Sequence, residues 1–198
     1  MATDSRIEIE GSSDIVVQFF ECSLHSILYQ RGVYPHEDFD FEARFGMNVL
    51  VSRNDELNLY LEEIIKQLHT WMHSNTIKKL VLVIKSKDTN ETLERWQFDV
   101  KTTNDKSKLT KEFDASKSTQ EIRAILRQIT ACVSFLPTLE DECTFNVLVY
   151  ADKDVEVPTS WADSDANLIP GGGEHVRLRS FSTDKHKIEP IVAYQLHQ

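Results

Sequence analysis

Residues 78–100 read KKLVLVIKSKDTNETLERWQFDV, the strongest β-strand signal in the chain. The first nine residues are rich in β-branched and aliphatic side chains, which is typical of a buried strand. The tetrapeptide DTNE (residues 88–91) is typical of a turn. Residues 92–100 then alternate, with Glu94, Trp96 and Phe98 on one side of the strand. The stretch therefore predicts a β-hairpin within a sheet.

Helical patterns lie on both sides of this hairpin. A helix over residues 14–30 is apolar around most of its circumference, which predicts a position deep in the core. Residues 55–75 repeat apolar side chains at helical spacing and predict a second helix. A third helix is predicted from Ser118, where Glu121 completes a capping-box pattern, to Pro137, which closes it.

The other strand candidates lie near the two ends of the chain. RIEIE (residues 6–10) predicts a short edge strand, CTFNVLVYA (143–151) an apolar one, and HVRLRSF (175–181) and IEPIVAYQ (188–195) two final strands. The polar residues 102–119 predict a surface loop. Because the helices and strands do not alternate one for one, we expect an α+β fold with helices on one face of a largely antiparallel sheet.

Length and charge limit the possible functions. The 198 residues predict one domain spanning residues 1–198, and the formal charge of -10 argues against nucleic acid as a partner. Cys22, Cys132 and Cys143 form an odd set in apolar stretches, as expected for reduced thiols that pack as small hydrophobes. We find no secretory signal or membrane-spanning run and expect a soluble intracellular protein without a membrane span.

Three patterns suggest chemistry without completing a motif. Gly171–Gly173 lacks the helix that a phosphate loop needs, because a strand is predicted after it. The segment of residues 163–174 places acids and Asn167 like a calcium loop, but Leu168 stands where that loop needs glycine. His69 and His73 have the spacing for a shared metal, but no third ligand is identifiable in the sequence.

We therefore expect no cofactor, no bound metal and no enzyme activity. No nucleophile elbow, Cys-His signature or pair of carboxylates in an apolar setting supports catalysis. A metal-dependent enzyme built on His69, His73 and the acids of the tail remains the less favoured alternative. The apolar strand over residues 143–151 offers a sheet edge instead, to which either the chain's own tail or a partner peptide can add a strand.

Several longer segments resemble one known family. SILYQRGVYP (26–35), LERWQFDV (93–100), LRQITACVSFLP (126–137) and VRLRSFSTDKHK (176–187), together with VAY (192–194), are similar to the mitotic arrest deficient two family, the HORMA-domain proteins of the spindle assembly checkpoint. The similarity extends from about residue 7 to 194. It implies a HORMA fold with three helices on a sheet and open and closed states.

In the closed state the resemblance makes residues 157–194 a mobile C-terminal safety belt around a partner's peptide. The implied peptides are segments of a kinetochore coiled-coil adaptor and of the anaphase-promoting complex activator, whose entrapment inhibits anaphase onset. Other mitotic checkpoint complex proteins are also implied as partners, with the nucleus, kinetochore and cytoplasm as locations. The residues expected at the peptide and in the belt are Trp71, Phe145, Val147, Val149, Trp161, Val176, Leu178, Phe181, Ile191 and Tyr194.

The resemblance also implies self-association of open and closed forms. It places Arg127, Gln128 and Phe135 of the third helix, with Arg179 of the belt, at the dimer interface, although periodicity alone makes Arg127 an ordinary solvated charge. The chain departs from the family pattern at Glu189 and Pro190, where neither residue can accept a phosphate and proline must face a bulge or edge. A HORMA adaptor of another pathway, such as DNA-damage tolerance or meiosis, is the main alternative.

Overall fold

The computed structural model describes residues 11–103 and 115–196. The strand expected over residues 6–10 and most of the loop expected over residues 102–119 lie outside them. The elements in chain order are α1 (Ser12–Gln30), η1 (His36–Asp38), β1 (Phe39–Arg44), β2 (Met47–Ser52), α2 (Asp55–His73), β3 (Ile77–Ser86), β4 (Thr92–Thr102), α3 (Ala115–Ala131), η2 (Cys132–Ser134), β5 (Cys143–Ala151), β6 (Glu174–Arg177), β7 (Phe181–Ser182) and β8 (His186–Tyr194).

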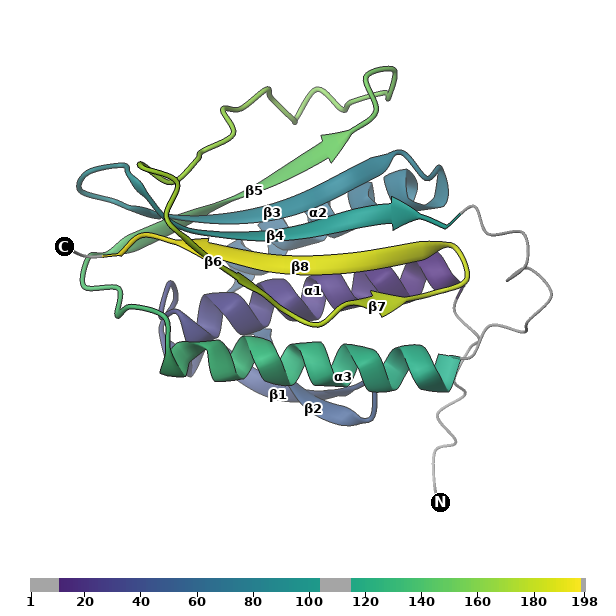
Figure 1. Ribbon diagram of the computed structural model, residues 1–198, viewed down its shortest axis with the longest axis horizontal. Helices are drawn as coiled ribbons and strands as arrows, with labels where there is room; N and C mark the ends of the chain where they lie inside the picture. The colour runs from purple at the N-terminus through teal and green to yellow at the C-terminus, as the bar shows by residue number, and fades with distance from the viewer. Residues whose placement is uncertain (1–10, 104–114, 197–198) are drawn as a thin grey trace.

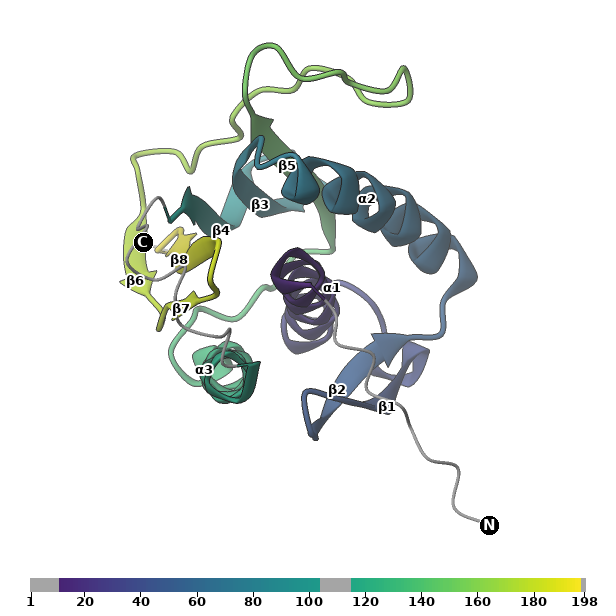
Figure 2. The ribbon, with the colours of Figure 1, turned by 90° about the vertical axis from the view of Figure 1, so that its right-hand side faces the viewer.

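The main sheet has the strand order β5-β3-β4-β8-β6, with β7 also paired to β8. All of its pairings are antiparallel. The last strand of the chain, β8, pairs with both β4 and β6 and lies between them. The sheet curves around the helices, which lie on its inner side (Figures 1 and 2). The expected α+β class and the hairpin over residues 78–100 are therefore confirmed. In the described part of the chain, no helix is long and apolar enough to cross a membrane.

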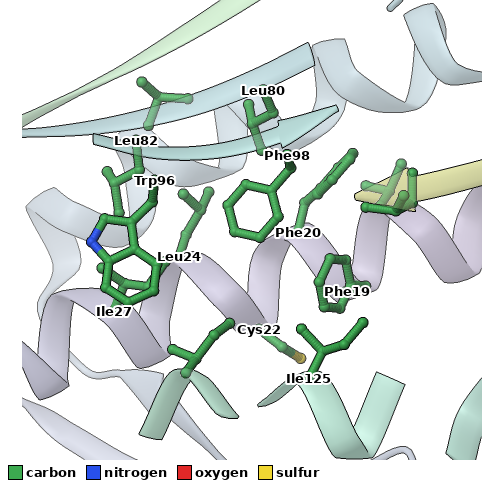
Figure 3. Packing of buried hydrophobic residues seen from close by; sticks show 14 of the residues in the cluster. Phe19, Phe20, Cys22, Leu24, Ile27, Leu80, Leu82, Trp96, Phe98 and Ile125 are labelled. Carbon is green, nitrogen blue, oxygen red and sulfur yellow. The ribbon is translucent and has the colours of Figure 1, made fainter. Parts of the chain in front are cut away.

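Helix α1 occupies the centre of the fold, as its all-round apolar pattern predicts (Figure 2). Phe19 packs against Phe181 of β7 with ring centroids 4.8 Å apart, and Phe20 packs against Phe98 of β4 at 5.9 Å. Cys22 lies in the same cluster (Figure 3), and burial raises the pKa of its thiol to about 12. α1 therefore joins the sheet to the helices around it.

Helix α3 begins earlier than predicted. It starts at Ala115, so the expected capping box at Ser118 and Glu121 is wrong: both residues lie inside the helix. The Ser118 hydroxyl donates to the Ser182 carbonyl at 2.9 Å, and the Ser182 N–H donates to the Glu121 carboxylate at 3.2 Å. These side chains have the chemistry of caps but satisfy the backbone of β7 instead, a tertiary contact that local sequence does not reveal.

The β1–β2 hairpin was not predicted from the sequence. Its two-residue turn is Phe45-Gly46, both with positive φ (51° and 64°), and it lacks the Asn-Gly or Asp-Gly signature of such turns. The guanidinium of Arg123 from α3 donates to the Phe45 carbonyl and occupies the space that a Cβ at position 46 would take. The hairpin tip is therefore held by α3.

The strand predicted over residues 175–181 is interrupted opposite Pro190. β6 ends at Arg177 and β7 starts at Phe181, and between them the Leu178 N–H donates to the Pro190 carbonyl at 3.0 Å. Since the N and C=O of a strand residue face the same side, the N–H that proline lacks would point at this break. The expectation that Pro190 faces an irregular neighbour is confirmed. Beside it, Lys101 and Lys187 lower the pKa of Glu189 to about 2.

A buried ion pair ties three parts of the fold together. Arg31, just after α1, donates from Nε to Glu94 of β4 at 2.8 Å, and its guanidinium also donates to the Pro137 carbonyl. The Trp96 indole donates to the second Glu94 oxygen at 3.0 Å. The side chains of Arg31 and Glu94 are only 5% and 1% exposed. Glu94 is therefore a charged residue on the side of β4 that the alternation of the strand assigns to the core.

Candidate functional site

Strand β5 forms an edge of the main sheet. It pairs with β3 along its length, and within residues 11–103 and 115–196 no strand pairs with its other edge. Phe145, Val147 and Val149 face the helices, while the intervening residues face outward. The outer edge therefore presents main-chain groups to which an extended peptide can hydrogen-bond.

A cavity of about 480 Å³ follows this edge. One wall comes from α2, a second from β5, and the third from a segment that begins nine residues after the end of β5. The lining residues include Tyr60, Glu63 and Ile64 of α2, Asn146–Tyr150 of β5, and Ser160–Ser164. The space thus lies where an added strand would place its side chains.

Tyr60 of α2 contacts the edge directly. Its ring lies 5.6 Å from the ring of Phe145. Burial raises the pKa of Tyr60, and a hydrogen bond between its hydroxyl and the backbone of Val147 lowers the pKa by a smaller amount. The Tyr60 hydroxyl therefore contacts the backbone of β5 beside the cavity.

The segment between β5 and β6, residues 152–173, crosses outside this edge, and we call it the strap (Figures 1 and 2). Its first part is held by α2. Trp71, 4% exposed, meets Trp161 edge-to-face with ring centroids 5.0 Å apart, and its indole N–H donates to the Glu156 carbonyl at 3.3 Å. The strap therefore starts from a rigid aromatic anchor.

The second part of the strap is held by the outer face of the sheet. Arg95 of β4 donates to the Ala166 carbonyl at 3.1 Å and to the Tyr150 hydroxyl at 3.2 Å. Lys85 of β3 donates to the Asn167 side-chain oxygen at 3.2 Å. With Trp71, these contacts fasten the strap on both sides of β5. The edge of β5 is thereby enclosed, and no strand in the described part of the chain pairs with it.

The glycines of the strap serve the turn into β6. Gly171, Gly172 and Gly173 have φ values of 72°, 89° and 64°, where L side chains are strained. At position 173 a Cβ would lie 2.5 Å from the Tyr194 carbonyl oxygen. A strand follows, so this run lacks the helix amino terminus of a phosphate loop.

The structure brings together part of the predicted site. Val147, Val149 and Trp161 line the cavity, Trp71 contacts Trp161, and Phe145 lies further along β5. The other predicted residues lie far from β5, in β6, β7, β8 and the segment between β6 and β7, where the tail docks: Val176, Leu178, Phe181, Ile191 and Tyr194. Tyr60, Lys85 and Arg95 were missed, because an outward residue of a strand or helix carries no sequence signal for a strap that crosses it.

The residues predicted for self-association lie on α3 or next to it. Gln128 accepts a hydrogen bond from the Arg179 N–H at 2.7 Å, so the two lie together. Arg127 is exposed and faces the β1–β2 hairpin across a hollow of about 440 Å³. Phe135 follows η2 and is 48% exposed. All four residues are therefore close to one helix, with Arg127 and Gln128 on different sides of it.

The comparisons with known proteins agree with this geometry. The family model described as HORMA domain matches residues 12–186. This chain belongs to the HORMA-domain family. It is 50% identical over 196 residues to the mitotic spindle checkpoint component mad2 of Schizosaccharomyces pombe, covering 98% of this chain and 96% of that protein. Its identity to the mitotic spindle assembly checkpoint protein MAD2A of Homo sapiens is 43% over 199 residues, covering 99% and 96% of the two chains.

A solved structure also matches over nearly the whole chain. The chain superposes on a chain from the crystal structure of the mitotic checkpoint complex with a TM-score of 0.85 and 51% identity, covering 94% of this chain and 100% of that one. The resemblance predicted from the sequence and the role as a HORMA adaptor of the spindle checkpoint are both confirmed. Adaptors of other pathways and a metal-dependent enzyme are not favoured as its function.

Proposed function

We propose that this HORMA adaptor binds an extended peptide as an added strand on β5 and retains it by enclosure under the strap. The observation that carries the proposal is an edge of β5 that pairs with no described strand, lies beside a cavity and is crossed by a segment fastened on both sides. Main-chain hydrogen bonds would each add about 1 kcal/mol, and the cavity would select side chains. The proposed ligands are segments of a kinetochore coiled-coil adaptor and of the anaphase-promoting complex activator.

We propose that the arrangement in this structure is the closed state of the switch. The belt, residues 157–194, includes most of the strap together with β6, β7 and β8. Strand β8 pairs with β4 over nine residues. Opening would unpair β8 and expose Phe181, Ile188 and Val192, all at most 1% exposed. Each such side chain costs about 1.5–3 kcal/mol to expose. Exchange between states is therefore far slower than peptide diffusion.

The biological consequence proposed is inhibition of anaphase onset by sequestration. The adaptor would need no catalytic residue, since enclosure alone holds the activator. It would act with other mitotic checkpoint complex proteins in the nucleus, at the kinetochore and in the cytoplasm. The similarity to checkpoint components of yeast and human supports this setting.

Backbone methylation of the ligand tests strand addition. Only every second N–H of a bound strand points at its neighbour. A labelled extended peptide, basic and then apolar in sequence, is methylated at one backbone nitrogen at a time, and its affinity for the full chain is measured by fluorescence anisotropy. We expect losses of at least about tenfold at alternate positions, since each abolishes a hydrogen bond and introduces a clash. Equal effects at neighbouring positions would show that the peptide does not bind as a strand.

We also propose that α3 supplies the self-association surface through Arg127, Gln128 and Phe135, with Arg179 beside them. Replacing Arg127 by Glu is expected to weaken self-association by about tenfold or more, as for an interface arginine, without changing the melting temperature. Sedimentation velocity over a concentration series measures this. Lys66→Glu, an equal charge reversal on the exposed side of α2, is the control. An unchanged sedimentation profile for Arg127→Glu would argue against this interface.

A further inference from the structure

We propose that Asp14, His69 and His73 form a binding site for one divalent transition-metal ion of the zinc class. Asp14 lies in the first turn of α1, and the two histidines lie one turn apart at the end of α2. One ligand atom from each residue lies within 4.8 Å of the others. The sequence shows two histidines without a third ligand, and the fold supplies that ligand from a residue 55 positions away.

The distances from the two histidines to Asp14 are close to those of metal coordination. His69 Nδ1 lies 3.2 Å from Asp14 Oδ1, and His73 Nε2 lies 3.6 Å from the same atom. In a tetrahedral zinc site with bonds of about 2.0–2.1 Å, ligand atoms are about 3.3–3.4 Å apart. Two imidazoles and one carboxylate are also a ligand set that zinc accepts, with water completing the shell. Side-chain exposures of 29–58% leave room for that water.

The contacts of His73 prepare it for coordination. Its Nδ1 lies 2.8 Å from the His69 carbonyl oxygen, which only accepts, so Nδ1 carries the proton and donates. Nε2, the atom that faces Asp14, then carries the free lone pair. A backbone carbonyl that fixes the tautomer of a histidine ligand is a usual second shell of zinc sites.

The electrostatic surroundings favour a cation. The carboxyl group of Glu21 in α1 interacts electrostatically with His69, although Arg44 interacts with Glu21 more strongly and offsets part of its charge. The carboxyl end of α2 carries negative partial charge, which attracts a cation. The chain as a whole has a formal charge of -10. The carboxyl end of α2 and the negative net charge therefore both attract a divalent ion.

A bound ion would fasten the start of α1 to the end of α2. Trp71, which anchors the strap, lies between the two histidines in the same turn of α2. An ion that binds the folded chain and not the unfolded one stabilises the fold in proportion to the logarithm of its concentration. The melting temperature therefore provides a second readout, separate from affinity.

Titration of the untagged, chelator-treated full chain tests the site. We expect isothermal titration calorimetry with Zn²⁺ to give one ion per chain, Co²⁺ to give the absorption spectrum of a tetrahedral complex, and Zn²⁺ to raise the melting temperature. Asp14→Asn and His73→Gln should each weaken binding by more than about tenfold, the lower bound for second-shell changes. His175→Gln, which removes an exposed histidine of β6, is the control and should bind as the unmodified chain does.

His73→Gln keeps the test decisive if Asp14→Asn disturbs the start of α1. Unchanged affinity in His73→Gln, or an equal loss in His175→Gln, would show that zinc binds elsewhere and would overturn the proposal. Binding only at millimolar zinc, with no change in melting temperature, would overturn it as well.

Discussion

Replacing Glu94 by Ala is expected to lower the free energy of unfolding by about 3–5 kcal/mol. The carboxylate is 1% exposed and accepts hydrogen bonds from Arg31 and from the Trp96 indole. Without it, the Arg31 guanidinium keeps its contact to the Pro137 carbonyl but loses its only counter-charge among the described contacts. Leaving a buried charge without a partner costs far more free energy than the intact ion pair contributes to stability. Urea denaturation followed by far-UV circular dichroism measures the change.

Two controls separate the buried charge from other causes. The double variant Arg31→Met/Glu94→Met removes both charges and should be more stable than Glu94→Ala. Asp40→Ala breaks the Arg53–Asp40 pair, in which both side chains are 62% exposed, and should change stability by less than about 1 kcal/mol. A loss below about 1 kcal/mol for Glu94→Ala would show that water or a rearranged partner compensates Arg31.

The second large effect is expected from a disulfide that locks β8 to β4. Lys101 and Lys187 are cross-strand partners, and Cα atoms of such pairs lie about 4.5–5.5 Å apart, within the range of a disulfide. In Lys101→Cys/Lys187→Cys the bond closes a covalent ring that contains β5 and the strap. Cys143 is half-buried, so it is replaced by Ser in this background. The lock removes the opening step that we propose for peptide binding.

Oxidation before the peptide is added should then prevent binding. The peptide carries a folded domain at each end, so it cannot thread through a closed ring. We expect the association rate to fall by at least about 100-fold in the oxidised variant and to recover on reduction. The reason is that binding requires β8 to leave β4, and the disulfide prevents this. The control His175→Cys/Ala193→Cys joins β6 to β8 and leaves β4–β8 free, so its oxidised form should bind normally.

Local patterns predicted the elements whose own side chains face the core. The all-round apolar α1, the amphipathic α2 and the β3–β4 hairpin were predicted from the spacing of apolar residues alone. In each of them, those apolar residues are the ones that pack in the core. The β1–β2 hairpin escaped prediction because Phe41 is 71% exposed and the Phe45-Gly46 turn lacks the usual residues. Its stability comes from Arg123, which is 77 positions further along the chain from Gly46 and closes the tip from α3.

The candidate site was predictable only in part, for a similar reason. Val147 and Val149 are strand residues of an apolar run, and any added strand must pass beside them. Arg95 is an outward residue of an alternating strand, and only the path of the strap gives it a role. The metal cluster shows the same limit, because Asp14 and His69 meet only when α1 packs on α2. Contacts between distant segments are decided by the fold and leave no local pattern.

The most direct measurement of enclosure is the release of a preloaded peptide from the locked ring. The domain-blocked peptide is bound first, Lys101→Cys/Lys187→Cys is then oxidised, and dissociation is followed against excess unlabelled peptide. If the strap encloses the ligand, the oxidised complex will not release it, and reduction will restore release at the rate of the unlocked chain. Release at the same rate before and after oxidation would show that the peptide lies outside the strap and would contradict the proposed mechanism.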